Sequence, residues 1–431
     1  MKETFIKLFS DQGMWGAVIA TMTFILLGYF ATKTKLFSAE MNNRLAKFGI
    51  SFLLPFLTFS ALMVDTNREN TAEIGIVLGM SIGFYVLFAI FTWLVVNYWP
   101  KLLPKWVERK TAEHFKKLEA ANPELVLTKT RDAYVRNYQA KLTTSWLMIG
   151  YGSLLVFASP LVSNMKGSVF SDFTNALLQI WNIPFTFALF SYKIMQYSGE
   201  KLTKENIKPI IKRICSPMMI LLFVSLFLWS LQWIPGLNNW YWTGKGSQPY
   251  ALSISDAQYI QWKTSGTISA NNVTKAMNLS DFHQFWGAFK LALPAFGTVL
   301  TLGAKIVSPV IWLVIGGSLA LSNIKEAVKD KAVWMTVGTK LIILPAIMLG
   351  IVLLFVYPYG GKGLITKETG TLIILLMVTP PATTCVMYAV AYKHDYAHYT
   401  SQASALGTLL SIIAMPIWIV IANLTYTAIA G

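Results

Sequence analysis

The sequence predicts an all-α polytopic membrane protein with ten transmembrane helices, and three observations support this fold class. Only 13% of the residues are charged, whereas soluble domains carry about 25%. Apolar stretches of about twenty residues, the length of helix that crosses a bilayer, recur along the whole chain. Lysine and arginine gather in alternate connecting segments, as the positive-inside rule expects. The apolar stretches are too long and uniform for barrel strands, so helices are the expected spanning form.

The ten expected spans follow one another from one end of the chain to the other. The first is expected to be a retained helix and not a signal peptide, because no small-residue cleavage site follows it. The spans cover residues 13–31, 43–64, 73–98, 145–164, 172–196, 210–233, 296–322, 332–357, 370–391 and 401–428.

The distribution of basic residues predicts how these helices are oriented. The loops after spans one, three, five and seven are rich in lysine and arginine, and the loops after spans two, four and eight are poorer. Odd-numbered loops are therefore expected to be cytoplasmic, with both termini outside the cell (plasma) membrane. Cytoplasmic anchoring explains the formal charge of +16 better than nucleic-acid binding does.

Two long connections divide the chain. The basic loop is expected to lie as a helical hairpin on the anionic inner leaflet, with a regulatory or partner-binding role as the alternative. The aromatic-rich extracellular loop is expected to contact lipid headgroups rather than to close over a ligand. The expected parts are transmembrane helices 1–3 in residues 1–98, the basic cytoplasmic loop in 99–144, helices 4–5 in 145–196, a cytoplasmic linker and helix 6 in 197–234, the extracellular loop in 235–295, and helices 7–10 in 296–431.

Span nine is interrupted near its middle by two consecutive prolines. Each proline lacks a backbone donor and clashes with the preceding helical turn, so Pro380 and Pro381 should break the helix. The second half-helix would then present N–H groups and a positive dipole end to an anion. The residues of this break, all candidate substrate-binding residues, are Thr379, Pro380, Pro381, Ala382, Thr383 and Thr384.

Span four has a similar interruption in the first half of the chain. Its candidate residues are Tyr151, Gly152, Ser153 and Pro160. A single proline in a membrane helix usually makes only a kink. Interruptions at corresponding positions of two halves instead indicate a binding site, and five spans per half predict a 5+5 inverted repeat.

Several stretches resemble the auxin efflux carrier family, which includes bacterial malate permease-like proteins and plant PIN auxin exporters. Span two contains LLPFLTFSAL, with Pro55 and Thr58 at the matching places, and span seven contains SPVIWLVIGGSLA with Pro309 and Gly316. The most specific match is TPPATTCVMYAVAYKHDYAHYTSQASALGTLLSIIAMPI, which looks like the last two helices of the family with their tight loop.

The resemblance implies an architecture similar to that of the sodium–bile acid symporters. Helices four and nine would cross at their broken midpoints, and the substrate would lie at that crossing. The resemblance also implies that Thr58 of span two and Asn182 of span five are neighbours of the substrate. Ser153 stands where the family often has asparagine, a departure that bears on which of the family's substrates this chain carries.

Two lysines lie inside apolar spans. A charge in such a position normally faces the protein interior or water. Lys305 is therefore either a fixed cation that attracts an anion or replaces a coupling cation, or a side chain that snorkels to the outer surface. Lys340 lies nearer the cytoplasmic end and is expected to snorkel. No aspartate or glutamate lies in mid-span, which argues against an acidic proton relay.

Together these features predict a secondary carrier for a small organic anion, malate-like or auxin-like, that works by alternating access. The expected partners are the organic acid and membrane lipid, without nucleic acid, metal or cofactor. Proton or sodium coupling and a homodimer are left open.

Three alternative functions follow from other interpretations. A sodium-coupled symporter of the bile-acid type could use Thr383, Thr384 and unwound carbonyls as ligands. A non-transporting sensor could use the basic loop as its output. An enzyme acting on lipid is disfavoured, because all four histidines lie in loops and no P-loop, HExxH or GxSxG pattern occurs.

Overall fold

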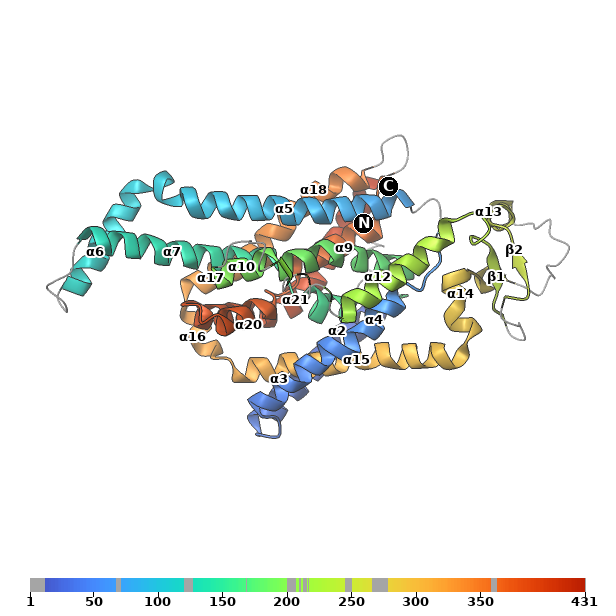
Figure 1. Cartoon of the computed structure of the whole chain (residues 1–431), viewed down its shortest axis with the longest axis horizontal. Coiled ribbons are helices and arrows are strands. Elements are labelled where there is room, and N and C mark those ends of the chain that lie inside the picture. Colours follow the sequence, from blue (N-terminus) through green and yellow to red (C-terminus); the bar gives the residue numbers. More distant parts are fainter. Residues whose placement is uncertain are drawn as a thin grey trace.

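The computed structural model describes residues 12–66, 71–119, 127–167, 169–199, 207–208, 211, 215, 217–244, 250–265, 278–357 and 363–430. This part of the chain is mostly helical, and its helices run along the long axis of an elongated molecule (Figure 1). The helix pair α6–α7 projects at one end, called here the α6 end. A small β-sheet lies at the opposite end, called here the sheet end (Figure 1). Much of the expected linker at 197–216 lies outside the described residues.

Most helices of the first half fall on the first five expected spans, whereas residues 104–119 and 127–144 form helices within the expected basic loop. The helices of the first half are α2 (Gln12–Lys33), α3 (Ala39–Phe48), η1 (Gly49–Leu53), α4 (Leu54–Ala61), α5 (Thr71–Leu102), α6 (Pro104–Glu119), α7 (Leu127–Gly150), η3 (Leu154–Ala158), α8 (Ser159–Asn164), α9 (Asp172–Phe190) and α10 (Tyr192–Ser198).

The second half contains the remaining spans and the sheet. Its elements are α12 (Pro217–Ser230), η4 (Leu231–Trp233), β1 (Trp240–Trp242), β2 (Ser253–Ile254), α13 (Asp256–Ser265), η5 (Leu279–Asp281), β3 (Phe282–Gln284), α14 (Phe285–Ala292), α15 (Pro294–Leu321), α16 (Ile324–Lys329), α17 (Lys331–Gly338), η6 (Thr339–Ile343), α18 (Leu344–Val356), α19 (Lys367–Val378), α20 (Thr383–Ala391) and α21 (Ala397–Ala430).

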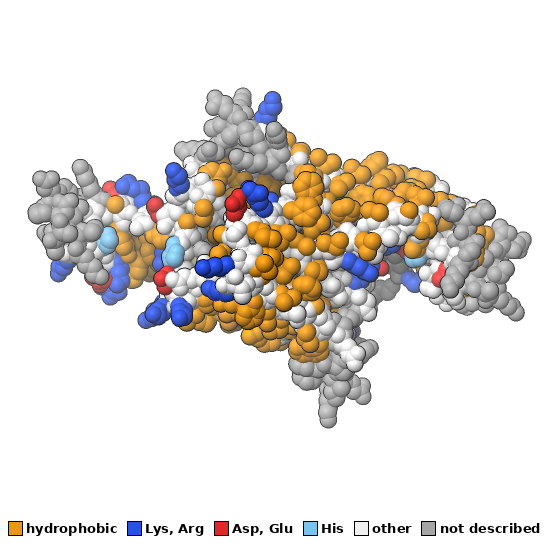
Figure 2. All heavy atoms as spheres, turned by 90° about the horizontal axis from the view of Figure 1, so that it is seen from below, with side chains coloured by type: hydrophobic (Ala, Val, Ile, Leu, Met, Phe, Trp, Pro, Cys, Tyr) orange, Lys and Arg blue, Asp and Glu red, His pale blue; other side chains and the backbone are white. Residues whose placement is uncertain are grey.

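The surface of the bundle is apolar where a soluble protein would be polar. On α5, for example, Ile82, Leu87 and Trp93 are about half or more exposed. Figure 2 shows hydrophobic side chains over the middle of one face, with Lys and Arg mainly toward the α6 end. Among the described residues, six helical stretches are long and apolar enough to cross a membrane. Exposed apolar helices of this length are suited to lipid, and the chain is a multi-pass membrane protein.

Three spans contain a π-helical turn placed just before a proline. The turns η1, η3 and η6 begin at Gly49, Leu154 and Thr339, and a proline follows the start of each by six residues: Pro55, Pro160 and Pro345. A proline cannot donate to the carbonyl four residues earlier and its ring crowds that carbonyl. Widening the preceding turn accommodates this defect without ending the helix.

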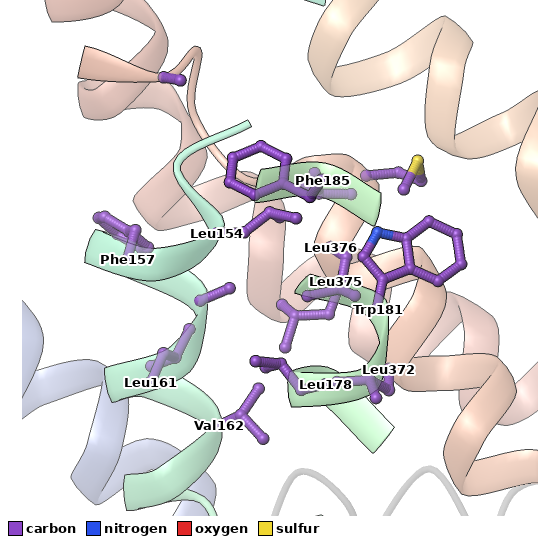
Figure 3. Packing of buried hydrophobic residues seen from close by; sticks show 14 of the residues in the cluster. Leu154, Phe157, Leu161, Val162, Leu178, Trp181, Phe185, Leu372, Leu375 and Leu376 are labelled. Carbon is purple, nitrogen blue, oxygen red and sulfur yellow. The ribbon is translucent and has the colours of Figure 1, made fainter. Parts of the chain in front are cut away.

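The core of the bundle lies where the second part of span four meets α9 and α19. Leu154, Phe157, Leu161 and Val162 of η3 and α8 are almost fully buried. They pack against α9 and α19, whose contributions in this view are Leu178, Trp181, Phe185, Leu372, Leu375 and Leu376 (Figure 3). This packing fixes the position of the interrupted span four against span nine.

The basic connection folds into helices, as expected for residues 99–144. Helix α6 packs on α7, and α7 continues from the connection into span four. Aromatic rings join the base of this hairpin: Tyr138 stacks on Trp99 with ring centroids 4.3 Å apart, and Trp106 lies 5.2 Å from Tyr138. The association of the hairpin with a membrane leaflet stays a prediction.

The connection at 235–295 contains a three-stranded sheet in the order β2-β1-β3. Both neighbours of β1 are antiparallel to it, and Trp240 pairs with Ile254 on one side and Gln284 on the other. Trp240 and Phe282 are buried in the small core of this sheet, so these two aromatic side chains are not available to lipid headgroups. The Asp65 carboxylate at the end of span two accepts a 2.8 Å hydrogen bond from the Gln284 N–H, which ties the sheet to the bundle.

Candidate functional site: the crossing of two broken helices

The two interruptions predicted in spans four and nine are present and meet each other. Helix α7 ends at Gly150 and α19 ends at Val378. The Ser153 N–H donates to the Pro380 carbonyl at 2.8 Å, and the Ala382 N–H donates to the Tyr151 carbonyl at 3.0 Å. These reciprocal bonds satisfy backbone groups that would otherwise be unpaired in an apolar interior. We call this paired segment the crossing.

Glycine and proline explain why the backbones can approach so closely. A Cβ on Gly152 would lie 2.0 Å from the Thr379 Oγ1, so only glycine fits opposite Pro381, its bridge partner. A Cβ on Gly407 of α21 would lie 2.4 Å from the Pro381 Cδ. Because Gly152 and Gly407 lack side chains, the backbones of spans four and ten can lie directly against the break in span nine.

The N-terminal ends of both second half-helices line one small cavity. This cavity of about 60 Å³ is bounded by residues 152–156 at the start of η3 and 382–384 at the start of α20. Each helix start carries a partial positive charge from its aligned peptide dipoles. The rest of the wall is apolar, with Phe185, Leu189 and Phe190 of α9 and Ile50 of η1.

A second cavity of about 260 Å³ adjoins the first toward the α6 end. It shares Ile50, Val156 and Thr383 with the small cavity. Its farther wall includes Asn42 at the start of span two and Ser322 at the end of span seven. Thr383, the first residue of α20, is thus the predicted site residue that borders both spaces. We call this the α6-side cavity.

Two fully buried lysines approach the crossing from neighbouring helices. Lys193 of α10 donates a hydrogen bond to the Thr384 hydroxyl, and its ammonium lies 5.3 Å from the centroid of the Tyr151 ring. The Lys340 ammonium lies 3.3 Å from the position that a Cβ on Gly152 would occupy. Neither lysine has an ion pair with a carboxylate among the described residues, which leaves two buried amines beside two positive helix ends.

The snorkelling expected of Lys340 is wrong. Only 1% of Lys340 is exposed. The residue lies in the π-helical turn η6, and its side chain is buried inside the bundle. The sequence gives the depth of a residue along its span, but the direction in which it points depends on packing against other helices. Lys193 was not identified from the sequence, although this lysine and Asp172 are the only charged residues of the expected span 172–196, and a charge in such a position is itself a signal of function.

The other candidate residues of the crossing have structural contacts of their own. Thr379 is buried and its hydroxyl donates to the Leu376 carbonyl at 2.7 Å, at the end of α19. The Tyr151 ring is buried beside Tyr85 and Phe185, with centroids 5.6 and 6.1 Å away. These contacts hold the break rigid.

Three predicted residues lie away from the crossing. Thr58 is buried in α4 and lines neither cavity at the crossing. Asn182 is buried on α9, and its amide lies 3.5 Å from the Ser159 hydroxyl, beyond the break in span four. Pro160 lies there too, and its carbonyl accepts a 2.7 Å hydrogen bond from Asn164.

Lys305 lines a different cavity, which opens toward the sheet end. This cavity of about 650 Å³ also receives Lys166 from the segment between α8 and α9 and Lys290 from α14. Its inner limit is at Ser308, whose hydroxyl accepts a 2.7 Å hydrogen bond from Asn164. Ile311, one helical turn further along α15, already lines the α6-side cavity. We call the 650 Å³ space the sheet-side cavity.

A comparison with protein families found one matching family model. A family model described as membrane transport protein matches residues 14–106 and 275–419. The two matched regions cover nearly all of span one, spans two, three and seven to nine, and the first part of span ten, including the whole break in span nine. No curated protein matches the chain.

Proposed function

Because the chain belongs to the membrane transport protein family of auxin efflux carrier-like transporters, we propose that it is a secondary transporter of small organic anions. In this proposal the ten spans form a 5+5 inverted repeat in the cell membrane, with both termini outside. The substrate, malate-like or auxin-like, binds at the crossing and passes by alternating access.

The observation that carries this proposal is the convergence of positive ends on one cavity. The starts of η3 and α20 border the same 60 Å³ space, and Lys193 reaches the Thr384 hydroxyl on its wall. Helix N-termini and buried ammonium groups both favour a negatively charged ligand. An arriving carboxylate would supply the negative charge that the described surroundings of Lys193 and Lys340 lack.

The walls of the cavity indicate what kind of acid fits. Phe185, Leu189 and Phe190 offer an apolar surface opposite the two helix starts. Apolar walls with a few convergent polar groups are typical of sites for ligands with an apolar body. The arrangement therefore favours a carboxylate on an apolar, auxin-like body over a compact hydroxy acid such as malate.

Alternating access has a structural basis in the two larger cavities. The sheet-side cavity ends at Ser308, and the α6-side cavity begins at Ile311 on the same helix. The barrier between them contains the cluster of Asn164, Ser308 and Pro160. A modest shift of α15 against α8 would break this small cluster and change which cavity reaches the crossing.

Sodium coupling of the bile-acid type is disfavoured by Lys193. A sodium ion at the break would need oxygen ligands such as the Thr384 hydroxyl, but the Lys193 ammonium already donates to that oxygen. A second cation beside a buried ammonium would be strongly repelled. Sodium-dependent uptake into proteoliposomes would contradict this argument.

The proposal is tested in two steps with purified protein. A thermal-shift screen of mono- and dicarboxylates, amino acids and sodium identifies the ligand, because a binder of the folded state raises its apparent stability. Uptake of that ligand is then measured in proteoliposomes. The paired change Thr383→Val and Thr384→Val should reduce uptake at least tenfold without lowering expression.

The matched control is Thr23→Val, because Thr23 lies on the exposed surface of α2 and its hydroxyl bonds only within its own helix. Uptake by the paired variant equal to that of the control would argue against the crossing as the site. The absence of uptake of any ligand by wild-type protein, together with intact binding, would favour the sensor interpretation.

A further inference from the structure

We propose that the sheet-side cavity is a second ligand site, which binds a small anion with two or more negative charges separately from the crossing. The residues that carry the site are Lys166, Lys290 and Lys305. They come from three different elements: the segment between α8 and α9, helix α14 and helix α15. Three ammonium groups around one water-accessible cavity create a strongly positive electrostatic potential inside it.

The charges around the cavity do not cancel. No aspartate or glutamate is among the described residues that line it. Asp172, outside the wall, forms an ion pair with Lys166. The Asp65 carboxylate, also outside the wall, lies near Lys290 and pairs with His283. The three lysines outnumber these two carboxylates, and the wall itself carries three ammonium groups and no carboxylate among its described residues, which favours a dicarboxylate or a phosphate dianion over a monovalent anion.

The bonding of the lysines leaves capacity for a ligand. The Lys290 ammonium donates to the Met63 carbonyl at 3.3 Å, a neutral acceptor that uses one of three donors. Lys305 is an exposed residue of α15 and has no hydrogen bond or ion pair among the described residues. Ser163 adds a hydroxyl to the wall that can donate to an oxygen of an anion. The amide hydrogens of Asn164 and the hydroxyl hydrogen of Thr298 are already donated to protein oxygens.

Titration behaviour supports mutual repulsion in the cavity. Burial lowers the pKa of Lys166 to about 8, and the nearby Lys290 ammonium contributes to the shift. Burial also lowers the pKa of Lys290, and the Asp65 carboxylate opposes that shift. An anion between these lysines would relieve the repulsion that helps to lower the pKa of Lys166.

The site is separate from the crossing in this structure. The Asn164–Ser308 hydrogen bond of 2.7 Å closes the inner end of the cavity. None of the residues at the break in span nine lines it. The inference therefore does not require that the crossing binds the same anion.

The test uses full-length protein in phosphatidylcholine nanodiscs, carrying Thr383→Val and Thr384→Val so that the crossing does not contribute. Thermal unfolding is followed with inorganic phosphate or malate, and with chloride at matched ionic strength. Phosphate and malate should raise the unfolding temperature with a saturable dependence, and chloride should not. Lys290→Gln and Lys305→Gln should each weaken the apparent Kd for phosphate at least tenfold.

Controls separate loss of the site from loss of the fold. Lys325→Gln, an exposed position of α16 at the α6 end, should leave the Kd unchanged, and Lys305→Arg should restore most of the binding lost in Lys305→Gln. Each variant must unfold cooperatively without anion. A wild-type-like Kd in both Gln variants, or no response to phosphate and malate, would overturn the inference.

A phospholipid headgroup also presents a phosphate group, so a separate experiment must distinguish lipid binding from binding of a soluble anion. The measurement is repeated in nanodiscs that contain phosphatidylglycerol. A lysine-dependent stabilisation that occurs only with this lipid, and never with soluble anions, would also overturn the proposal. Failure of this test leaves the uptake assay at the crossing unaffected, so the two proposals can fail independently.

Discussion

Replacing Gly152 by alanine should lower the free energy of unfolding more than a glycine-to-alanine replacement on the surface does. The added Cβ would lie 2.0 Å from the Thr379 Oγ1, whereas ordinary contact begins at 3.4 Å, so the two atoms must separate by about 1.4 Å. Thr379 is fully buried and its hydroxyl donates to the Leu376 carbonyl at 2.7 Å. Overpacking of this kind costs about 1–3 kcal/mol, and losing the hydrogen bond adds about 1 kcal/mol.

The measurement is the free energy of unfolding of Gly152→Ala, together with its uptake of the ligand found by thermal shift. The matched control is Gly350→Ala in α18, where an added Cβ has nothing within 4 Å. The control should be neutral or slightly stabilising, because alanine is the better helix former. Gly152→Ala should be destabilised relative to it, and uptake should fall because the two breaks can no longer pair.

A rescue variant tests the physical cause. Thr379→Ala in the Gly152→Ala background removes the clashing hydroxyl and leaves the Cβ of residue 379 at 3.2 Å as the nearest atom, which is tight but tolerable. The double change should recover at least ~1 kcal/mol relative to the sum of the single changes. If Gly152→Ala is as stable and active as Gly350→Ala, or if the rescue fails, the close pairing of the two breaks is refuted as the reason for the glycine.

Three further predictions concern charge and backbone at the two cavities. Lys193→Met removes a fully buried amine, so the unfolding temperature should stay equal or rise. Uptake should fall about tenfold, which corresponds to ~1.4 kcal/mol of binding free energy. Normal uptake by this variant would show that Lys193 does not belong to the site. Pro380→Ala with Pro381→Ala should let α19 and α20 join into a continuous helix, which abolishes uptake while helical content by circular dichroism is kept or rises; intact uptake would favour a different binding site. Malate-induced stabilisation at the sheet-side cavity should shrink between pH 7 and pH 9, because Lys166, whose pKa is lowered to about 8, loses its proton beside Asp172, Lys290 and Lys305. Malate is the probe here because its carboxylates stay ionised over this range, whereas phosphate gains negative charge near neutral pH. Without anion, the same shift makes folding stability rise between about pH 8 and 10.5, since the unfolded lysine holds its proton longer. Stabilisation that is constant across this range would contradict the pH prediction.

The positions of the breaks could be predicted from the sequence because proline chemistry is local. Pro380 and Pro381 end α19 regardless of what surrounds them. The extent of each apolar stretch is likewise a local property, because its length and polarity are read directly from the sequence. Helix length and apolar composition identify only six spans among the described residues. The break leaves α19 with 12 residues and α20 with 9 residues, each too short for a full crossing, and α7 is long enough but carries charged residues in its first half.

The pairing of the breaks and the lysines around them could not be predicted with the same ease. The register of Tyr151–Ser153 against Pro380–Ala382 depends on how distant helices pack. The same is true of Lys340, which points inward, and of Lys305, which lies at the sheet-side cavity and not at the crossing. A backbone pairing as short as this one leaves no periodic pattern of polar and apolar residues by which the sequence could indicate it.

The thinness of the barrier on α15 has an electrical consequence. Ser308 and Ile311 are three residues apart, so the two large cavities approach each other to about 4.5 Å along the helix axis. Water in both cavities would bring the bulk potentials of the two compartments close to this layer, and most of the membrane voltage would then drop across a single helical turn. An anion that crossed it, as proposed above, would move through nearly the whole field, ~2.3 kcal/mol per elementary charge for each 100 mV. The membrane potential would therefore add to the concentration gradient as a driving force at this layer.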